Sequence, residues 1–190
     1  MNKIGKTLVC VGTLLILCSI GLFIYFTCED KFASIKSKQI VDEIKIDLEK
    51  VDNNSVSSSD IVSKYYNGFE TIGIISIPTL NLELPVLSSW DYSKLKVAPS
   101  IYYGSLNKKG LIICAHNYVS HFKYLPNLNT DDYVIITDLG NRHYFYKVKE
   151  KKVIEPTSIN EVMNTDYDLI LFTCIKDGYV RYAVYCERVY

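Results

Sequence analysis

One cysteine and one arginine flank an Asp-Gly pair in the stretch LILFTCIKDGYVRYAVY, residues 169–185. Asp-Gly favours a two-residue β-hairpin loop, and a hairpin with that loop pairs Cys174 directly with Arg181. Side chains paired in this way point to the same face of the sheet, and their Cβ atoms lie about 4.5–5.5 Å apart. The sequence therefore predicts a thiol and a guanidinium that face each other beside a tight turn.

A cation beside a thiol has two chemical uses. It favours the thiolate, which is the nucleophilic form, and it can stabilise the oxyanion that develops on an acyl group under attack. A cysteine at the end of an apolar strand is often only a small buried apolar residue, but an arginine is rarely buried without a partner or a task. We therefore interpret Cys174 as a nucleophile and Arg181 as its electrostatic partner.

Acyl transfer through a thiol also needs a group that moves protons, and histidine is the side chain whose charge changes near neutral pH. The chain has three histidines. His143 lies in an alternating strand and is expected at the surface, and His121 lies in the polar loop YVSHFKYL. His116 ends the apolar strand LIICA, where a strand end can project a side chain into a cleft. His116 is therefore the favoured proton-transfer residue.

An uncharged apolar segment, residues 7–27, precedes these candidates. It is long enough to cross a hydrocarbon layer of about 30 Å as a helix. A cleaved signal peptide would have a shorter apolar core and a small-x-small site, and that site does not follow Phe26. Lys3 and Lys6 precede the segment, and the positive-inside tendency places them in the cytoplasm. We expect a single-pass membrane anchor with a cytoplasmic tail, residues 1–6, and an extracellular remainder.

Residues 28–67 are expected to form an amphipathic helix followed by a polar linker. The segment KFASIKSKQIVDEIKIDLEKV has apolar residues at three- and four-residue steps, and DNNSVSSSD follows it. The helix could be a membrane-surface or docking element. Its polar face mixes both charge signs, so we favour a solvated stalk.

The remainder, residues 68–190, has the pattern of an all-β domain. Short β-branched or aromatic segments alternate with turn residues, and one short helix is expected at 158–164. Seven short strands in about 120 residues indicate a closed or nearly closed antiparallel barrel or a sandwich. The seven candidate strands are 72–77, 82–87, 110–115, 133–138, 143–153, 169–174 and 179–189.

The charge balance argues against nucleic acid as a partner. Lys plus Arg and Asp plus Glu both number 21, so no positive excess is available to neutralise phosphates. Asp131 and Asp132 are interpreted as turn residues and not as a calcium site. We expect neither a metal nor a cofactor.

The six cysteines do not resemble a disulfide framework, because Cys10 and Cys18 lie in the anchor. Cys114 and Cys186 could form a disulfide, although buried free thiols are favoured. A zinc site that combines Cys114 and His116 with Cys174 or Cys186 is a further alternative. The usual Cys-x-x-Cys spacing is absent, which argues against it.

Several motifs, in order along the chain, resemble the sortases, the membrane-anchored cysteine transpeptidases of Gram-positive bacteria. They are TIGIISIP with LELPV, GLIICAHNY, DDYVIITDLGNRHYFYKV, LILFTC and an arginine seven positions after its cysteine. The resemblance covers about residues 69–190. It implies a closed, sortase-type antiparallel β-barrel of about eight strands with one or two short helices, preceded by the N-terminal transmembrane helix.

The resemblance also implies a reaction and its catalytic residues, His116, Cys174 and Arg181. Cys174 would attack a C-terminal sorting signal of the Leu-Pro-x-Thr-Gly type on a surface protein and form a thioacyl enzyme. His116 would protonate the leaving amine, and Arg181 would hold the threonine and the oxyanion. An amine of a peptidoglycan precursor or a pilin would then take the acyl group.

Two other functions stay open at this point. A membrane-tethered, non-catalytic β-domain that binds peptide or cell-wall polymer would not require the three residues together. A Cys-His peptidase would use the same nucleophile and release its product to water.

Overall fold

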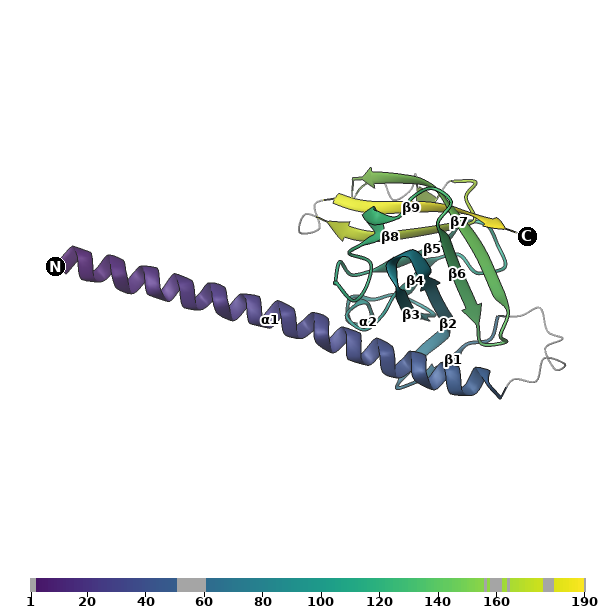
Figure 1. Ribbon diagram of the computed structural model, residues 1–190, viewed down its shortest axis with the longest axis horizontal. Helices are drawn as coiled ribbons and strands as arrows, with labels where there is room; N and C mark the ends of the chain where they lie inside the picture. The colour runs from purple at the N-terminus through teal and green to yellow at the C-terminus, as the bar shows by residue number, and fades with distance from the viewer. Residues whose placement is uncertain are drawn as a thin grey trace.

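The computed structural model describes residues 3–50, 61–155, 157, 162–163, 165–175 and 180–189 (Figure 1). The linker at 52–60, the Asp-Gly turn and most of the helix expected at 158–164 lie outside the described residues. The elements are α1 (Lys3–Leu48), β1 (Lys64–Tyr66), β2 (Phe69–Ile77), η1 (Pro78–Leu80), β3 (Leu82–Leu87), α2 (Tyr92–Leu95), β4 (Ser100–Tyr103), β5 (Leu111–Ala115), η2 (Leu125–Asn127), β6 (Tyr133–Asp138), β7 (His143–Ile154), β8 (Leu169–Ile175) and β9 (Val180–Val189).

The strands form one sheet that closes on itself. Their order is β1-β2-β3-β4-β5-β8-β9-β7-β6, and β2 also pairs with β6. Strands β2 to β9 thus make the expected closed barrel of eight strands, and β1 extends the start of β2 as a hairpin. Two neighbouring pairs, β3–β4 and β5–β8, are parallel, which corrects the expectation of a wholly antiparallel barrel. The parallel pairs arise because β4 and β8 are reached by crossover connections and not by hairpins.

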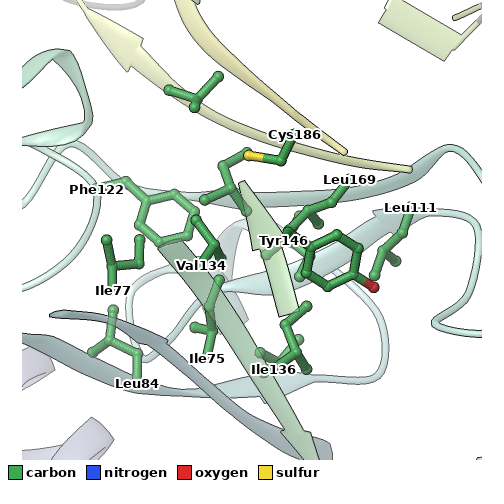
Figure 2. Close-up of a cluster of buried hydrophobic side chains, with 14 of the residues drawn as sticks. Ile75, Ile77, Leu84, Leu111, Phe122, Val134, Ile136, Tyr146, Leu169 and Cys186 are labelled. Atoms are coloured by element: carbon green, nitrogen blue, oxygen red, sulfur yellow. The ribbon is translucent and has the colours of Figure 1, made fainter. Parts of the chain in front are cut away.

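The barrel interior is filled by aliphatic and aromatic side chains from all sides (Figure 2). Along β7 buried and more exposed residues alternate, as in a strand with one face in the core. Strand β5 is buried along its whole length because a second apolar cluster covers its outer face. That outer cluster contains Ile112, Cys114, Ile170, Phe172, Ala183 and Tyr185 from β5, β8 and β9, together with Leu95, Ile154 and Val162.

Helix α1 runs without interruption from the apolar segment onto the barrel. Its N-terminal half extends away from the barrel, and its C-terminal half lies along it (Figure 1). Among the described residues it is the one helix long and apolar enough to cross a membrane. Its apolar side chains there are exposed, which is unfavourable in water and suits a lipid environment. The expected anchor, residues 7–27, therefore lies in the part of α1 that is free of the barrel.

The amphipathic helix expected within residues 28–67 was predicted to be a solvated stalk, and this prediction is wrong. The C-terminal half of α1 buries one stripe of side chains against β1, β2, β3 and the segment after α2, so it is a docking helix. Phe32 and Ile35 also follow the apolar spacing of this segment, but their side chains are 60% and 58% exposed. Small residues let the helix approach the barrel closely, and they occupy part of the stripe. Its buried members are Ala33, Ser37, Ile40, Val41 and Ile44.

Candidate active site

The pairing of β8 with β9 sets the first part of the site. Cys174 lies directly opposite Arg181, and Ile175 lies opposite Val180. This is the register that the Asp-Gly pair predicts, so that prediction is confirmed for the described strands. Cys174 and Arg181 are both partly buried. The thiol therefore has a cation beside it and is still accessible to a substrate.

The parallel pairing of β5 with β8 adds His116. Ala115 pairs with Thr173, and the Thr173 hydroxyl donates a hydrogen bond of 2.9 Å to the Ala115 carbonyl oxygen. His116 and Cys174 are each the next residue along these two strands. Neighbouring strands lie about 4.8 Å apart. His116 thus follows β5 at the end of the ladder where Cys174 of β8 pairs with Arg181 of β9.

The cysteine and the arginine lie on the outer face of the barrel. Residues two apart in a strand share a face, so Cys174 shares the face of Phe172, and Arg181 shares that of Ala183. Both neighbours belong to the outer apolar cluster. Cys114 is buried in the same cluster, and the nearby Cys174 and Arg181 both influence its thiol, whose pKa burial raises to about 12. Cys114 thus stays protonated beside the candidate nucleophile.

Two nitrogen atoms of the site have no hydrogen-bond partner among the described residues. They are Nε2 of His116 and Nη1 of Arg181, and both atoms are buried. A buried polar atom without a partner costs about 1–3 kcal/mol. Such atoms are uncommon in native proteins and often mark functional positions. Both nitrogens thus have hydrogen-bonding capacity that the described residues do not use.

The surroundings of His116 favour the neutral imidazole. Burial lowers its pKa, the charge of Lys96 lowers it further, and the charge of Glu29 opposes both effects. Glu29 comes from α1 and forms an ion pair of 2.8 Å with Lys96. A neutral imidazole at neutral pH can accept a proton from a thiol or an amine.

The other two histidines lie outside this site. His143 is exposed, as predicted, and its Nδ1 lies 2.9 Å from the Thr137 hydroxyl. His121 was expected in a polar loop, but it is only 1% exposed because α1 covers that loop. Its Nε2 lies 3.5 Å from the Ser37 hydroxyl of α1. Burial, and then the charge of His116, lower its pKa to about 4.

His121 makes the stability of the protein depend on pH. Its ordinary pKa is 6.5 and its folded-state pKa is about 4, so between these values the unfolded chain binds more protons. Stability is therefore lost as the pH falls from 6.5 to 4, by about 3 kcal/mol for this one group. We expect His121→Gln, which cannot titrate, to lose correspondingly less stability in this window than the wild type. Urea unfolding at a series of pH values measures the difference, and parallel curves for the two proteins would contradict it.

The cysteines of the described chain are all free thiols. Cys114 packs in the outer cluster and Cys186 in the barrel interior, so the alternatives of a disulfide between them and of a zinc site that uses both are wrong. Within the described ranges, no group of three or more His, Cys, Asp or Glu side chains could hold a metal ion.

Comparison with known proteins identifies the family to which this fold belongs. Residues 75–189 match the model of the sortase domain family. The chain belongs to the sortase family. Sortase D of Bacillus subtilis (strain 168) is 28% identical to this sortase over 126 residues, which cover 62% of this chain and 63% of the relative. The chain therefore spans less than two thirds of that relative. Sortase A of Bacillus anthracis is 29% identical over 162 residues, which cover 80% of this chain and 77% of the relative.

Solved sortase structures share the fold of this sortase domain. A Clostridium perfringens sortase D5 transpeptidase superposes with a TM-score of 0.64 at 20% identity, over 82% of this chain and 99% of that one. Clostridium perfringens sortase C, solved with the C-terminal cell wall sorting motif, has a TM-score of 0.57 at 22% identity, over 79% and 89% of the two chains.

Proposed function

We propose that this sortase is a cysteine transpeptidase that cleaves a C-terminal sorting signal and transfers the acyl group to an amine. The proposal is supported by the pairing of Cys174 with Arg181 and by the position of His116, which directly follows β5 where β5 pairs with β8. A thiol, a proton-transfer group and a permanent cation are what acyl transfer through a thioester requires. A signal of the Leu-Pro-x-Thr-Gly type on a surface protein is the proposed substrate. The C-terminal cell wall sorting motif with which Clostridium perfringens sortase C was solved supports this choice.

In the first step the sulfur of Cys174 attacks the carbonyl carbon of the scissile amide. The neutral imidazole of His116 takes the thiol proton as the C–S bond forms, and Arg181 stabilises the oxyanion. The C–N bond then breaks, and His116 gives its proton to the leaving amine. The product of this step is a thioacyl enzyme and a free amine.

In the second step an acceptor amine from a peptidoglycan precursor or a pilin attacks the thioester. His116 takes a proton from this amine as the new C–N bond forms, the C–S bond breaks, and His116 gives the proton to the departing sulfur of Cys174. One amide bond is exchanged for another through a thioester, so the reaction needs no ATP.

The proposed location is the outer surface of the cell membrane. The free half of α1 would cross the membrane with the N-terminus in the cytoplasm, as the positive charges before it favour. The barrel would then lie outside the cell, where surface proteins and cell-wall amines meet.

The test uses the full chain in detergent micelles and a small library of sorting peptides. We expect intact-mass measurement to show one acyl adduct on Cys174, and a thiol reagent to label Cys174 faster than the buried Cys114. No adduct with any peptide, together with equal labelling of the two thiols, would favour the non-catalytic binding domain. Adding an amine separates the peptidase alternative, because a transpeptidase then forms the amide in place of the free acid.

Arg181 provides a quantitative prediction. Arg181→Ala should lower kcat by about 10²–10³-fold, because it removes a donor aimed at the developing oxyanion. Arg181→Lys should recover only part of this loss, since it keeps the charge and loses the planar fork. Steady-state kinetics with a fluorogenic peptide measure both variants.

Arg188→Ala is the matched control for Arg181. It removes an arginine from the same strand, where the guanidinium packs on the Tyr144 ring at 4.7 Å, away from the site. Equal losses of kcat in Arg188→Ala and Arg181→Ala would contradict a specific role for Arg181.

A further inference from the structure

The short loop after β5, residues 116–121, is held by the helix that carries the membrane anchor. We call it the His loop because it begins at His116. Asp30 of α1 accepts hydrogen bonds from the backbone N–H of Val119 at 3.0 Å and of Ser120 at 3.1 Å. It also accepts one from the Ser120 hydroxyl at 2.5 Å. Hydrogen bonds to a charged acceptor are stronger than neutral ones, so a single carboxylate fixes two successive peptide units of the loop.

Glu29, the residue before Asp30 on α1, contacts His116 indirectly through the ring of Tyr118. The Tyr118 ring packs on the His116 ring with centroids 4.9 Å apart. The Tyr118 hydroxyl donates a hydrogen bond of 3.4 Å to Glu29, which also pairs with Lys96. The helix thus contacts the ring that supports His116 as well as the backbone that follows it.

The part of α1 that makes these contacts is itself fixed. Ala33 is fully buried, and the Ser37 hydroxyl donates a hydrogen bond of 2.5 Å to the Val97 carbonyl oxygen. Ile40 and Ile44 are fully buried farther along the helix. Asp30 therefore lies one turn before a docked helical segment and has a defined position relative to the barrel.

The imidazole depends on this support more than Cys174 and Arg181 do. Cys174 and Arg181 are held in regular strands by ladder pairing, whereas His116 follows the last residue of β5. A displacement of about 1 Å in a reacting group can cost about 100-fold in rate. Hydrogen bonds within the turn link the Phe122 N–H to the His116 carbonyl oxygen at 3.3 Å and the His121 N–H to the Tyr118 carbonyl oxygen at 3.0 Å. The Asp30 contacts join this turn to α1 and so fix its position relative to the rest of the protein.

We propose that Asp30 is a positioning residue, which fixes the His loop so that the membrane-anchor helix holds His116 beside Cys174. The inference rests on the proposed function for the role of His116, and on the hydrogen bonds of Asp30 for the rest. The anchor helix is in this way a structural part of the active site as well as a membrane tether.

The experiment compares Asp30→Ala and Asp30→Asn with the wild type, as full chains in detergent micelles. We expect Asp30→Ala to lower kcat by about 10–100-fold and to leave KM within about twofold, because the contacts of Asp30 are to the His loop and not to Cys174 or Arg181. Asp30→Asn keeps one carbonyl oxygen as an acceptor, so its kcat should fall less than that of Asp30→Ala. The acid limb of the kcat/KM profile should move to higher pH in Asp30→Ala, because a freed imidazole is better solvated and its pKa rises toward the ordinary value.

Asp47→Ala is the matched control. Asp47 lies on the same helix and binds Lys64 and the Tyr66 hydroxyl of β1, not the His loop. Its loss removes contacts near the C-terminal end of α1 and keeps the buried residues next to Asp30, so kcat and the pH profile should be unchanged. Equal losses of kcat in the Asp30 and Asp47 variants, or an Asp30→Ala protein with wild-type kcat and pH profile, would overturn the proposal.

A readout independent of turnover separates this inference from the proposed function. NMR titration of labelled histidines reports the pKa of His116 directly, and we expect it to rise in Asp30→Ala and stay unchanged in Asp47→Ala. If His116 responds in this way while no peptide forms an acyl enzyme, the positioning inference stands and the transpeptidase proposal fails. If the wild type forms the acyl enzyme and the pKa of His116 is the same in Asp30→Ala, the transpeptidase proposal stands and the positioning inference fails. The titratable or charged groups around His116 are Glu29, Lys96, Tyr118, His121, Cys174 and Arg181.

Discussion

Replacing Cys174 with Ala is expected to lower kcat/KM for sorting peptides by at least about 10⁴-fold, because the thioacyl intermediate cannot form. Peptide binding should persist, since Arg181 and the rest of the site are unchanged. The combination of lost turnover and retained binding is what distinguishes a nucleophile from a residue that only supports the fold. Turnover assays and fluorescence anisotropy with the same labelled peptide measure the two properties.

Cys114→Ala is the control for this variant, because Cys114 is a buried thiol on the neighbouring strand. Its side chain is 2% exposed, and its pKa of about 12 keeps it protonated and unreactive. We expect Cys114→Ala to lose some stability through the small cavity it creates and to retain acyl-enzyme formation. A Cys174→Ala protein that still formed the adduct, or a Cys114→Ala protein that did not, would refute the assignment of the nucleophile.

The second large effect is expected at His116. His116→Gln should lower kcat by about 10²–10⁴-fold, the usual contribution of a general acid–base group. In the wild type the lowered pKa of His116 means that the base form persists below pH 6.5, so kcat/KM should fall only as the pH drops through that lowered value. In His116→Gln this acid limb should disappear.

His143→Gln is the matched control for His116, because it removes an exposed imidazole from the start of β7. We expect its kcat/KM and its pH profile to match the wild type. An unchanged acid limb in His116→Gln would show that another group titrates there, and the proton-transfer role would have to be reassigned.

The sequence predicted much of the barrel because its strands alternate clearly and end at turn residues. Each of the seven expected strands occurs in the structure, most with ends within one or two residues of those expected. The missed strands are β1 and β4, of three and four residues. Segments this short carry too little periodicity to detect, and β4 pairs with β3 at a single position, Leu87 with Ser100.

The candidate site was predictable where local rules determine geometry. The Asp-Gly pair predicts the register of Cys174 and Arg181 through a hairpin rule, and the described strands have that register. The contacts that support His116 could not be predicted from the sequence, because they come from a helix that is far away along the chain. Asp30 is 89 residues from Val119, and in the sequence it resembles a charge that merely flanks a membrane segment. The burial of His121 was hidden for the same reason, since a docked helix covers a loop whose composition is polar.

The order of the strands divides the barrel into two halves that meet at two seams. Strands β1 to β5 form one contiguous half, and β6 to β9 form the other. The seams are β5–β8 and β2–β6, and at the second of these Gly73 leaves no room for a Cβ, which would lie 2.1 Å from the Thr137 carbonyl oxygen. At the β5–β8 seam, His116 follows the strand on one side, and Cys174 and Arg181 lie on the other side. The candidate base and the candidate nucleophile thus come from different halves of the barrel, so the proposed reaction requires both halves to be assembled.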